Sequence, residues 1–249
     1  MSALVPRLLL TFGCAALAFL PWRPTAAGEF TPAQRQAIES VVRDYLTNNP
    51  DVLLGALRAA KVKLDRDADA KTAALIADHR HQIYDDPQTP VGGNPHGNVT
   101  LVEFFDYRCP YCKETQPALE KLLAENSRLR LVYKELPILG PVSVTAAHAA
   151  LAAARQGKYE TFHRAMMAAR GNIADATVLQ IARSVGLDVD RLERDMAAPE
   201  IGKAITANIK LADALDINGT PAFVIGDRMI PGAVDLAGLQ RLVADPEQK

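Results

Sequence analysis

Two cysteines, Cys109 and Cys112, are separated only by Pro110 and Tyr111 in the motif CPYC. Such a pair can alternate between a dithiol and a disulfide, and the thiolate of one cysteine is the form that attacks another disulfide. The motif follows an apolar segment and precedes a segment with helical periodicity, so we predict that Cys109 lies at a helix N-terminus. The free N–H groups and positive dipole end of that helix would stabilise its thiolate.

A lone CxxC motif has other uses, and the rest of the sequence argues against two of them. A structural zinc site needs four ligands, and the chain has neither a second CxxC motif nor a histidine pair at finger spacing. Attachment of c-type haem needs His directly after the second cysteine, where this chain has Lys113. Redox chemistry is therefore favoured. Binding of Cu(I) by the two thiolates stays open as an alternative, although a third soft ligand is missing.

The composition is that of an ordinary globular protein. The chain has 249 residues, 49% of them hydrophobic, and a formal net charge of -1. This charge, without a long basic run, argues against nucleic acid as a partner. The length suffices for a sizeable core in one large domain, or in a domain with an accessory segment.

The N-terminus resembles a secretory signal. Arg7 precedes the apolar residues 8–20, and small residues follow at 25–27, so we predict a signal peptide over residues 1–27 that is cleaved near Ala27. A retained anchor and lipidation at Cys14 are alternatives, but the apolar run is short for a membrane span and Thr11 is atypical of a lipoprotein signal. Cleavage would leave Cys109 and Cys112 as the only cysteines, in a compartment where disulfides persist.

Residues 28–90 are expected to form a helical N-terminal region. Thr31 is a candidate N-cap with Pro32 at the first helical position, and a second helical run begins at Asp51. The apolar stripe of the second run is narrow and is interrupted by charges over residues 61–71. Homo-oligomerisation through residues 30–86 would bury it, and a solvated linker helix is the alternative.

The remaining chain shows the pattern of an α/β domain. Residues 86–97 are rich in Pro and Gly and are predicted to be a loop or boundary. A strand over 99–105, a helix over 110–126 and a strand over 129–136 predict a βαβ unit with parallel strands. A helical segment over about 143–215 follows, then strands at 222–225 and 228–230 and a last helix at 235–244.

Two separated motifs make the chain resemble the DsbA-like branch of the thioredoxin superfamily. These are FFDYRCPYC at residues 104–112 and GTPAF at residues 219–223. The resemblance implies an α/β thioredoxin fold over residues 91–249 with an inserted helical subdomain at about 143–215. Read with the helical N-terminal extension, the motifs are most similar to the ScsC and Com1-type members.

The resemblance also implies roles for individual residues. Cys109 would be the nucleophile and Cys112 the resolving thiol, so that the cofactor is their own redox-active disulfide and no other is required. Thr220 and Pro221 would form the cis-proline element, with the Thr220 backbone offered to an extended substrate segment. Glu103 resembles the buried acid beneath the dithiol that helps to move protons.

Two features bear on the direction of the reaction. Strongly oxidising members carry a histidine where this chain has Tyr111, which supplies no cation to the Cys109 thiolate. Thr220 before the proline is what disulfide isomerases of the superfamily tend to show. Lys134, on the next strand, is expected to pair with Glu103, either as a proton-handling pair or as a plain buried ion pair.

The resemblance therefore implies a periplasmic thiol:disulfide oxidoreductase that leans towards disulfide isomerase. Its expected partners are unfolded or incorrectly disulfide-bonded secreted proteins, a membrane redox protein of the Dsb or Scs type, and further copies of itself. A DsbA-like oxidase and a copper-handling thiol protein are the alternatives.

Overall fold

The computed structural model describes residues 30–171 and 173–244, and the expected signal peptide at residues 1–27 lies outside them. The chain divides into two compact units, Met1–Ala60 and Lys61–Lys249, which are described separately. Helix α2 (Pro50–Asp78) contributes to both. Within the described residues, no helix combines the length and apolar character needed to cross a membrane.

The first unit contains helix α1 (Pro32–Asn48) and the first turns of α2. As predicted, Thr31 caps α1: its hydroxyl accepts from the Gln34 N–H, and the Gln34 side chain accepts from the Thr31 N–H at 2.9 Å. Pro32 then stands at the first turn, where a missing N–H costs nothing.

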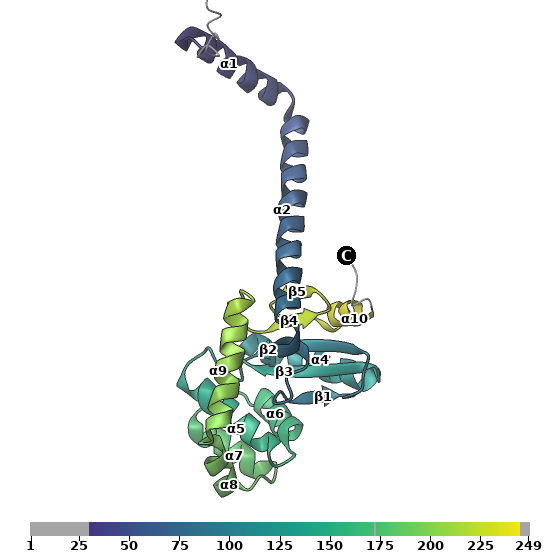
Figure 1. Cartoon of the computed structure of the whole chain (residues 1–249), viewed down its shortest axis with the longest axis vertical. Coiled ribbons are helices and arrows are strands. Elements are labelled where there is room, and N and C mark those ends of the chain that lie inside the picture. Colours follow the sequence, from purple (N-terminus) through teal and green to yellow (C-terminus); the bar gives the residue numbers. More distant parts are fainter. Residues whose placement is uncertain (1–29, 172, 245–249) are drawn as a thin grey trace, which may run out of the picture. The chain divides into compact units, whose positions relative to one another are not determined.

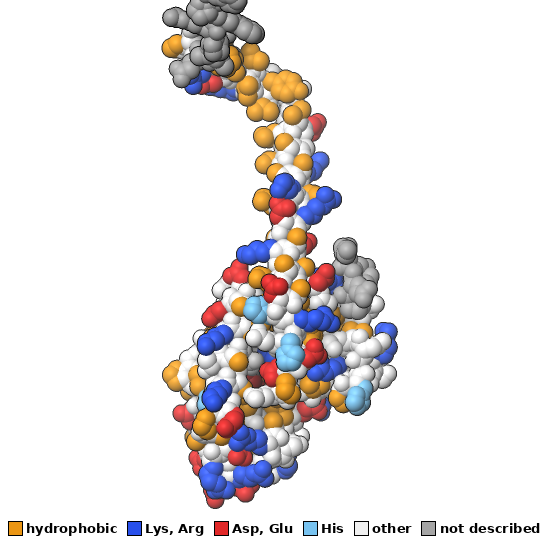
Figure 2. All heavy atoms as spheres, viewed as in Figure 1, with side chains coloured by type: hydrophobic (Ala, Val, Ile, Leu, Met, Phe, Trp, Pro, Cys, Tyr) orange, Lys and Arg blue, Asp and Glu red, His pale blue; other side chains and the backbone are white. Residues whose placement is uncertain are grey.

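Hydrophobic side chains of the first unit face solvent. Figure 2 shows them along α1 and the first part of α2, where no residue before Ile76 is buried. The exposed large side chains of this unit are Phe30, Ile38, Val41, Val42, Tyr45, Val52, Leu53, Leu54 and Leu57. The described residues of this unit therefore form no hydrophobic core of their own.

The second unit is built on a five-stranded mixed sheet in the order β1-β3-β2-β4-β5. The strands are β1 (Val91–Gly93), β2 (Val99–Phe105), β3 (Leu129–Glu135), β4 (Ala222–Ile225) and β5 (Arg228–Pro231). Strands β2 and β3 are parallel and are joined by α4 (Pro110–Glu125), which confirms the predicted βαβ unit. The other neighbours pair antiparallel.

Strand β1 corrects the prediction that residues 86–97 are only a loop. Val91–Gly93 pairs antiparallel with the outer edge of β3. Three residues, two of them glycine, carry no period-two pattern, so a strand could not be predicted here. Gly92 is required here because a Cβ atom would lie 2.6 Å from the Tyr133 hydroxyl oxygen.

A group of helices lies between β3 and β4 in the chain. These are α5 (Pro141–Ala154), α6 (Tyr159–Ala168), α7 (Asp175–Ser184), α8 (Val189–Met196) and α9 (Pro199–Ala214). Figure 1 shows α5 to α8 gathered beside the sheet, with α9 leading the chain back towards β4. Six alanines of α5 are buried, so this helix can pack closely against its neighbours.

Each face of the sheet is covered by its own hydrophobic cluster. On one face, Leu101 and Phe105 pack with side chains of α4, α5, α6 and α10 (Leu236–Ala244). On the other, Val102 and Phe104 pack with the end of α2, with α3 (Arg80–Tyr84) and with α9. Successive side chains of β2 thus point into the two hydrophobic clusters in turn. Glu103 points into the same cluster as Leu101 and Phe105.

Candidate active site

Cys109 is the N-cap residue of α4, as predicted, and Pro110 occupies the first turn. The buried Asp106 shapes the loop between β2 and this helix. Its backbone oxygen accepts from the Cys109 N–H at 3.0 Å, and its carboxylate accepts from the backbone N–H of Arg108 at 2.7 Å and the Ser143 hydroxyl at 2.8 Å. Asp106, which the sequence analysis did not single out, therefore fixes where the first sulfur lies.

The surroundings of the two cysteines give them different pKa values. The pKa of Cys109 is lowered to about 6, chiefly by a hydrogen bond from the Cys112 thiol, against the opposing effect of burial. Backbone N–H groups of Tyr111 and Cys112 at the start of α4 contribute to the same lowering. Burial raises the pKa of Cys112 far above its ordinary value. Cys109 is thus the thiolate at neutral pH, and Cys112 stays protonated.

Thr220 and Pro221 lie against the dithiol although they follow it by more than a hundred residues. Their peptide bond is cis, and the Cys109 sulfur lies 3.1 Å from the Thr220 carbonyl oxygen, to which it donates in its thiol form. A groove of about 280 Å³ runs alongside, lined by residues 216–222 together with Met229, Pro231 and Gly232. Tyr111 is 60% exposed beside this region.

Glu103 is fully buried in the centre of β2, opposite Tyr133 of β3 and Phe223 of β4. Neither of its carboxylate oxygens has a hydrogen-bond partner among the described residues. Burial, and then the nearby Cys109, raise the pKa of Glu103 to about 8. Its charge also contributes to the raised pKa of Cys112. This isolated acid lies close enough to the dithiol to be coupled with it electrostatically.

The expected pairing of Glu103 with Lys134 is wrong. Glu103 lies opposite Tyr133, so Lys134, one position on, projects to the other face of the sheet. There its ammonium donates to the Thr89 hydroxyl at 2.7 Å and lies 3.5 Å from an Asp86 carboxylate oxygen. Whether residues on two neighbouring strands share a face depends on the register of the strands, which the sequence alone does not reveal.

A buried polar network beside the site was not anticipated. The Glu135 carboxylate accepts from the Tyr159 hydroxyl at 2.7 Å and from the Tyr107 hydroxyl at 3.3 Å. Tyr107 also lies 3.1 Å from Nδ1 of His163, whose Nε2 is 3.3 Å from the Gln116 side-chain oxygen. Burial lowers the pKa of His163 to about 3, so this histidine is neutral. An acid at Glu135, in phase with buried Leu129, Leu131 and Tyr133, was the signal that could have revealed it.

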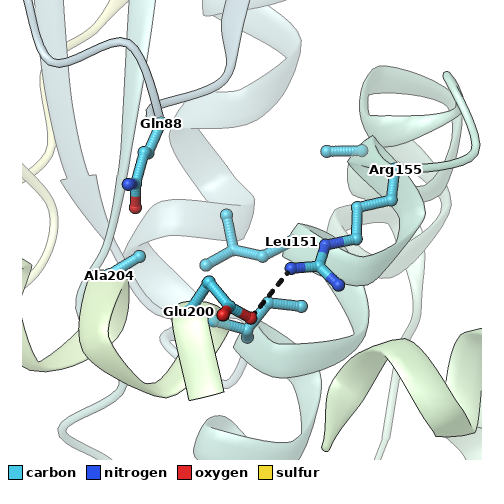
Figure 3. Close-up of a pocket in the computed structure, with 7 residues that line it drawn as sticks. Gln88, Leu151, Arg155, Glu200 and Ala204 are labelled. Carbon is cyan, nitrogen blue, oxygen red and sulfur yellow. Dashed lines mark hydrogen bonds and ion pairs between the residues drawn. The ribbon is translucent and has the colours of Figure 1, made fainter. Parts of the chain in front are cut away.

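The cavity shown in Figure 3 lies between α5 and α9 and contains none of these residues. In it the Arg155 guanidinium reaches towards Glu200, with a nitrogen to oxygen distance of 3.4 Å. Among the described residues, no group of three or more His, Cys, Asp or Glu side chains is arranged to hold a metal ion.

Comparison with known proteins places this site in a family. Residues 100–244 match the DSBA-like thioredoxin domain. The chain belongs to this family. Residues 34–59 match the N-terminal domain of the copper resistance protein ScsC. The resemblance drawn from the two motifs and the predicted DsbA-like fold with its helical N-terminal region are thereby confirmed.

Solved structures of DsbA-like proteins share the fold. A thioredoxin-like oxidoreductase from Silicibacter pomeroyi DSS-3 is 50% identical, with a TM-score of 0.65 over 66% of this chain and 95% of that one. The thiol-disulfide exchange protein alpha-DsbA2 from Wolbachia pipientis is 31% identical, with a TM-score of 0.68 over 72% and 97%. ScsC from Proteus mirabilis, in a transitional conformation, is 28% identical with a TM-score of 0.64 over 87% and 98%.

Curated relatives match over a shorter share of their length. The Na(+)/H(+) antiporter NhaA 3 of Salinispora tropica is 32% identical over 155 residues, which are 61% of this chain and 24% of the antiporter. The chain therefore spans about a quarter of the curated relatives that it matches. The match over residues 100–244 shows the DsbA-like family, and the likeness to ScsC and DsbA2 shows the fold.

Proposed function

We propose that this DsbA-like protein exchanges disulfides of secreted proteins in the periplasm through Cys109 and Cys112, and that isomerisation is its main activity. The observation that carries the proposal is Cys109 itself. Its sulfur lies at the start of α4 with its pKa lowered to about 6, directly beside the Thr220 carbonyl. A thiolate at neutral pH with a docking edge next to it is what disulfide exchange requires.

The chemistry proceeds through a mixed disulfide. The Cys109 thiolate attacks one sulfur of a substrate disulfide, so that a bond to Cys109 forms, the substrate bond breaks and a substrate thiolate leaves. Cys112 then loses its proton and attacks the Cys109 sulfur, which closes the Cys109–Cys112 disulfide and releases the second substrate thiolate. Two electrons pass from the protein to the substrate. In isomerisation a substrate thiolate resolves the mixed disulfide instead, and there is no net electron transfer.

Glu103 is proposed to take the Cys112 proton. Cys112 cannot attack while its thiol is protonated, and its pKa is raised by burial. Glu103, whose pKa is about 8, has no other hydrogen-bond partner among the described residues and is coupled to both sulfurs. A buried acid with a pKa near the working pH can both accept and return a proton.

The groove beside Thr220 and Pro221 is proposed to hold the substrate segment. The Thr220 carbonyl faces the sulfur, and the adjacent hollow of about 280 Å³ lies at the start of β4 and beside β5, the edge strand of the sheet. A backbone edge of this kind binds extended peptide with little dependence on side chains. It therefore suits an enzyme that acts on many unfolded substrates.

Self-association of the N-terminal unit is proposed to turn the exchange activity into isomerisation. The apolar side chains of α1 and early α2 are exposed and pack into no core among residues 30–60, and a second copy of the same stripe would cover them. Several dithiols held together raise the effective concentration of active sites around one substrate, so that it can be recaptured repeatedly.

The test uses two variants of the full chain. Val41→Asp with Leu53→Asp places two charges in the exposed apolar stripe, and Gln36→Asp with Thr47→Asp places the same two charges on polar positions of α1. We expect the first to lower the mass in solution and to abolish refolding of scrambled ribonuclease, while its reduction of a small disulfide is unchanged. The Gln36→Asp, Thr47→Asp control should resemble the unmodified protein. Full isomerase activity in a monomeric variant would exclude this role for the N-terminal unit.

Location and partners are proposed from the resemblance and tested together. A Cys112→Ala variant should accumulate mixed disulfides on Cys109, because the resolving thiol is gone. The Cys112→Ala variant is expressed in cells, which are then fractionated. We expect its mixed disulfides in the periplasmic fraction, with secreted proteins and with a membrane redox partner of the Dsb or Scs type. Complexes confined to the cytosolic fraction would contradict the proposal.

Copper handling is the second candidate, because residues 34–59 match a domain named for copper resistance. Cys109 and Cys112 would supply two soft thiolate ligands for Cu(I). Titration of the reduced protein with Cu(I) against a chromophoric competitor tests this. Tight binding of one equivalent that Cys109→Ser removes would support it, and a competitor that retains all the metal would exclude it.

A further inference from the structure

A hollow on the helical side of the dithiol gathers positive charge. It has a volume of about 280 Å³, and its lining includes Arg108, Pro110, Lys113, Arg170 and Ile173. None of its lining residues is acidic. The hollow shares no residue with the groove beside Thr220. The dithiol is thus bordered by two different surfaces, one made largely of backbone and apolar side chains and one cationic.

Lys113 is held in place at this hollow by the end of α6. Its ammonium donates to the carbonyl oxygens of Met166 and Ala169, each at 2.8 Å. Burial, and then the nearby Arg170, lower the pKa of Lys113 to about 8. The Lys113 side chain therefore still carries its positive charge at neutral pH, and the positive charge of Arg170 repels it.

The two arginines also use neutral partners. Arg108 donates to the Leu139 carbonyl and Arg170 to the Met167 carbonyl. In the part of the chain that the structure describes, neither arginine nor Lys113 forms an ion pair with a carboxylate. Each guanidinium has five N–H donors, so donors remain for a ligand. Arg155 differs, because Asp195 and Glu200 compensate its charge.

The hollow borders the loop that carries Cys109. Arg108 and Pro110 are the residues directly before and after Cys109. A chemical group that binds in the hollow would therefore be part of the same substrate that reacts with Cys109. The negative groups that a peptide offers next to a cysteine are the side chains of Asp and Glu, and planar guanidinium groups match the geometry of a carboxylate.

We propose that this hollow is a subsite for a carboxylate carried close to the disulfide that Cys109 attacks. The inference rests on the proposed exchange activity and adds to it a preference among substrates. The carboxylate belongs to an acidic side chain flanking the substrate cysteine, or to a small disulfide such as oxidised glutathione. Arg108 and Arg170 are specificity-determining residues in this view, and the sulfur chemistry itself does not depend on them.

The test compares two peptides that differ only in Asp or Asn beside the cysteine, each as a mixed disulfide with a neutral chromophoric thiol. Second-order rate constants with the reduced full-length protein are measured by stopped flow. We expect the Asp peptide to react about fivefold faster at low ionic strength, the advantage of a carboxylate beside several partly exposed cations. The preference should shrink at about 0.5 M salt, and also as the pH rises through the pKa of Lys113 near 8.

Two arginine variants separate the subsite from general charge. Arg170→Gln should reduce the ratio of the Asp-peptide rate constant to the Asn-peptide rate constant to about twofold. Arg194→Gln removes the same charge from an exposed position on α8 that does not line the hollow, and it should leave the preference intact. A second arm compares oxidised glutathione with its carboxyl methyl ester. A preference in the peptide arm identifies a flanking side chain, and one in the glutathione arm identifies a small disulfide.

Equal rates for acid and neutral substrates in both arms would overturn the subsite and leave the exchange activity standing. A preference that survives in both Arg170→Gln and Arg108→Gln would overturn it as well. If no disulfide reacted at all, the proposed exchange function would fail, and the subsite with it.

Discussion

At the scale of single residues, Cys109 and Cys112 show how one side-chain type acquires two roles. Cys109 receives hydrogen bonds from the Cys112 thiol and from N–H groups at the start of α4, which lowers its pKa. Cys112 is one turn further into the helix, where burial raises its pKa. The difference between attacking and resolving sulfur follows from position along one helical turn.

The lowered pKa of Cys109 makes the reactivity of the reduced protein depend on pH. The thiolate contributes stability that is fully present above the unfolded pKa near 9 and is lost as the pH falls through about 6. We expect the rate of alkylation by iodoacetamide to rise with a midpoint near pH 6. The Cys112→Ala variant should shift that midpoint upwards by about one unit, because it removes the strongest hydrogen bond to the thiolate.

Cys109→Ser is the control for this measurement. In a chain that starts at residue 28, and so lacks Cys14, the remaining Cys112 stays protonated and alkylation below pH 8 should be almost abolished. Equal alkylation of the two single-cysteine variants would contradict the assignment of Cys109 as the thiolate.

Glu103 should make the protein less stable as the pH rises. Its pKa in the folded state is about 8 against an ordinary 4.5, so its stabilising contribution is complete below about pH 4.5 and is lost as the pH rises through about 8. In the reduced protein, Glu103→Gln should match the unmodified protein at pH 4. At pH 9 it should be more stable by on the order of 3 kcal/mol, measured by urea denaturation. A difference that does not change with pH would show that Glu103 is not isolated from solvent.

At the scale of elements, β3 joins the site to the helical group. Glu135 ends the strand and accepts hydrogen bonds from Tyr107, beside the dithiol loop, and from Tyr159 of α6. Side chains along β3 alternate between the two faces of the sheet. Lys134 therefore projects to the other face, where it binds Asp86 and Thr89. One strand thus ties two separate parts of the unit to the sheet.

Tyr159→Phe tests the strength of this connection. It removes the 2.7 Å hydrogen bond and leaves a buried carboxyl with a weaker partner, so we expect a loss of about 1–3 kcal/mol in the free energy of unfolding. Tyr133→Phe is the matched control, because its hydroxyl forms no hydrogen bond with another described residue and it lies on the same face of β3. It should change stability by less than about 0.5 kcal/mol. Similar losses in both variants would mean that hydroxyl volume matters and the hydrogen bond does not.

At the scale of the molecule, much of the second unit followed from the sequence. Apolar runs and capping residues predicted the positions of several elements correctly. These are strand β2, helix α4 with Cys109 as its cap, the start of α9 at Pro199, and strand β4. The motifs also indicated the proximity of Thr220 to Cys109, which no periodicity could supply. Register and short edge strands were not predictable, which is why the partner of Lys134 and the strand β1 were missed.

Residues 76–91 contribute to the folding of the second unit. Ile76, Ile83 and Tyr84 are buried against the sheet, and the Tyr84 hydroxyl donates to the Gly226 carbonyl at 2.8 Å. A chain starting at residue 61 should therefore fold and reduce small disulfides. A chain starting at Gly92 should have a lower melting temperature, by at least about 10 °C, because it loses these three side chains. Equal thermal stability of the two chains, measured by circular dichroism, would contradict this role.

The three hydrogen bonds accepted by Asp106 link parts of the unit that the chain separates widely. One carboxylate binds the Arg108 N–H of the redox loop, the Leu139 N–H and the Ser143 hydroxyl of α5. A substrate that binds to the helical group and displaces α5 would therefore also displace the loop that carries Cys109. The position of the dithiol loop is thus connected to the position of α5 through a single carboxylate.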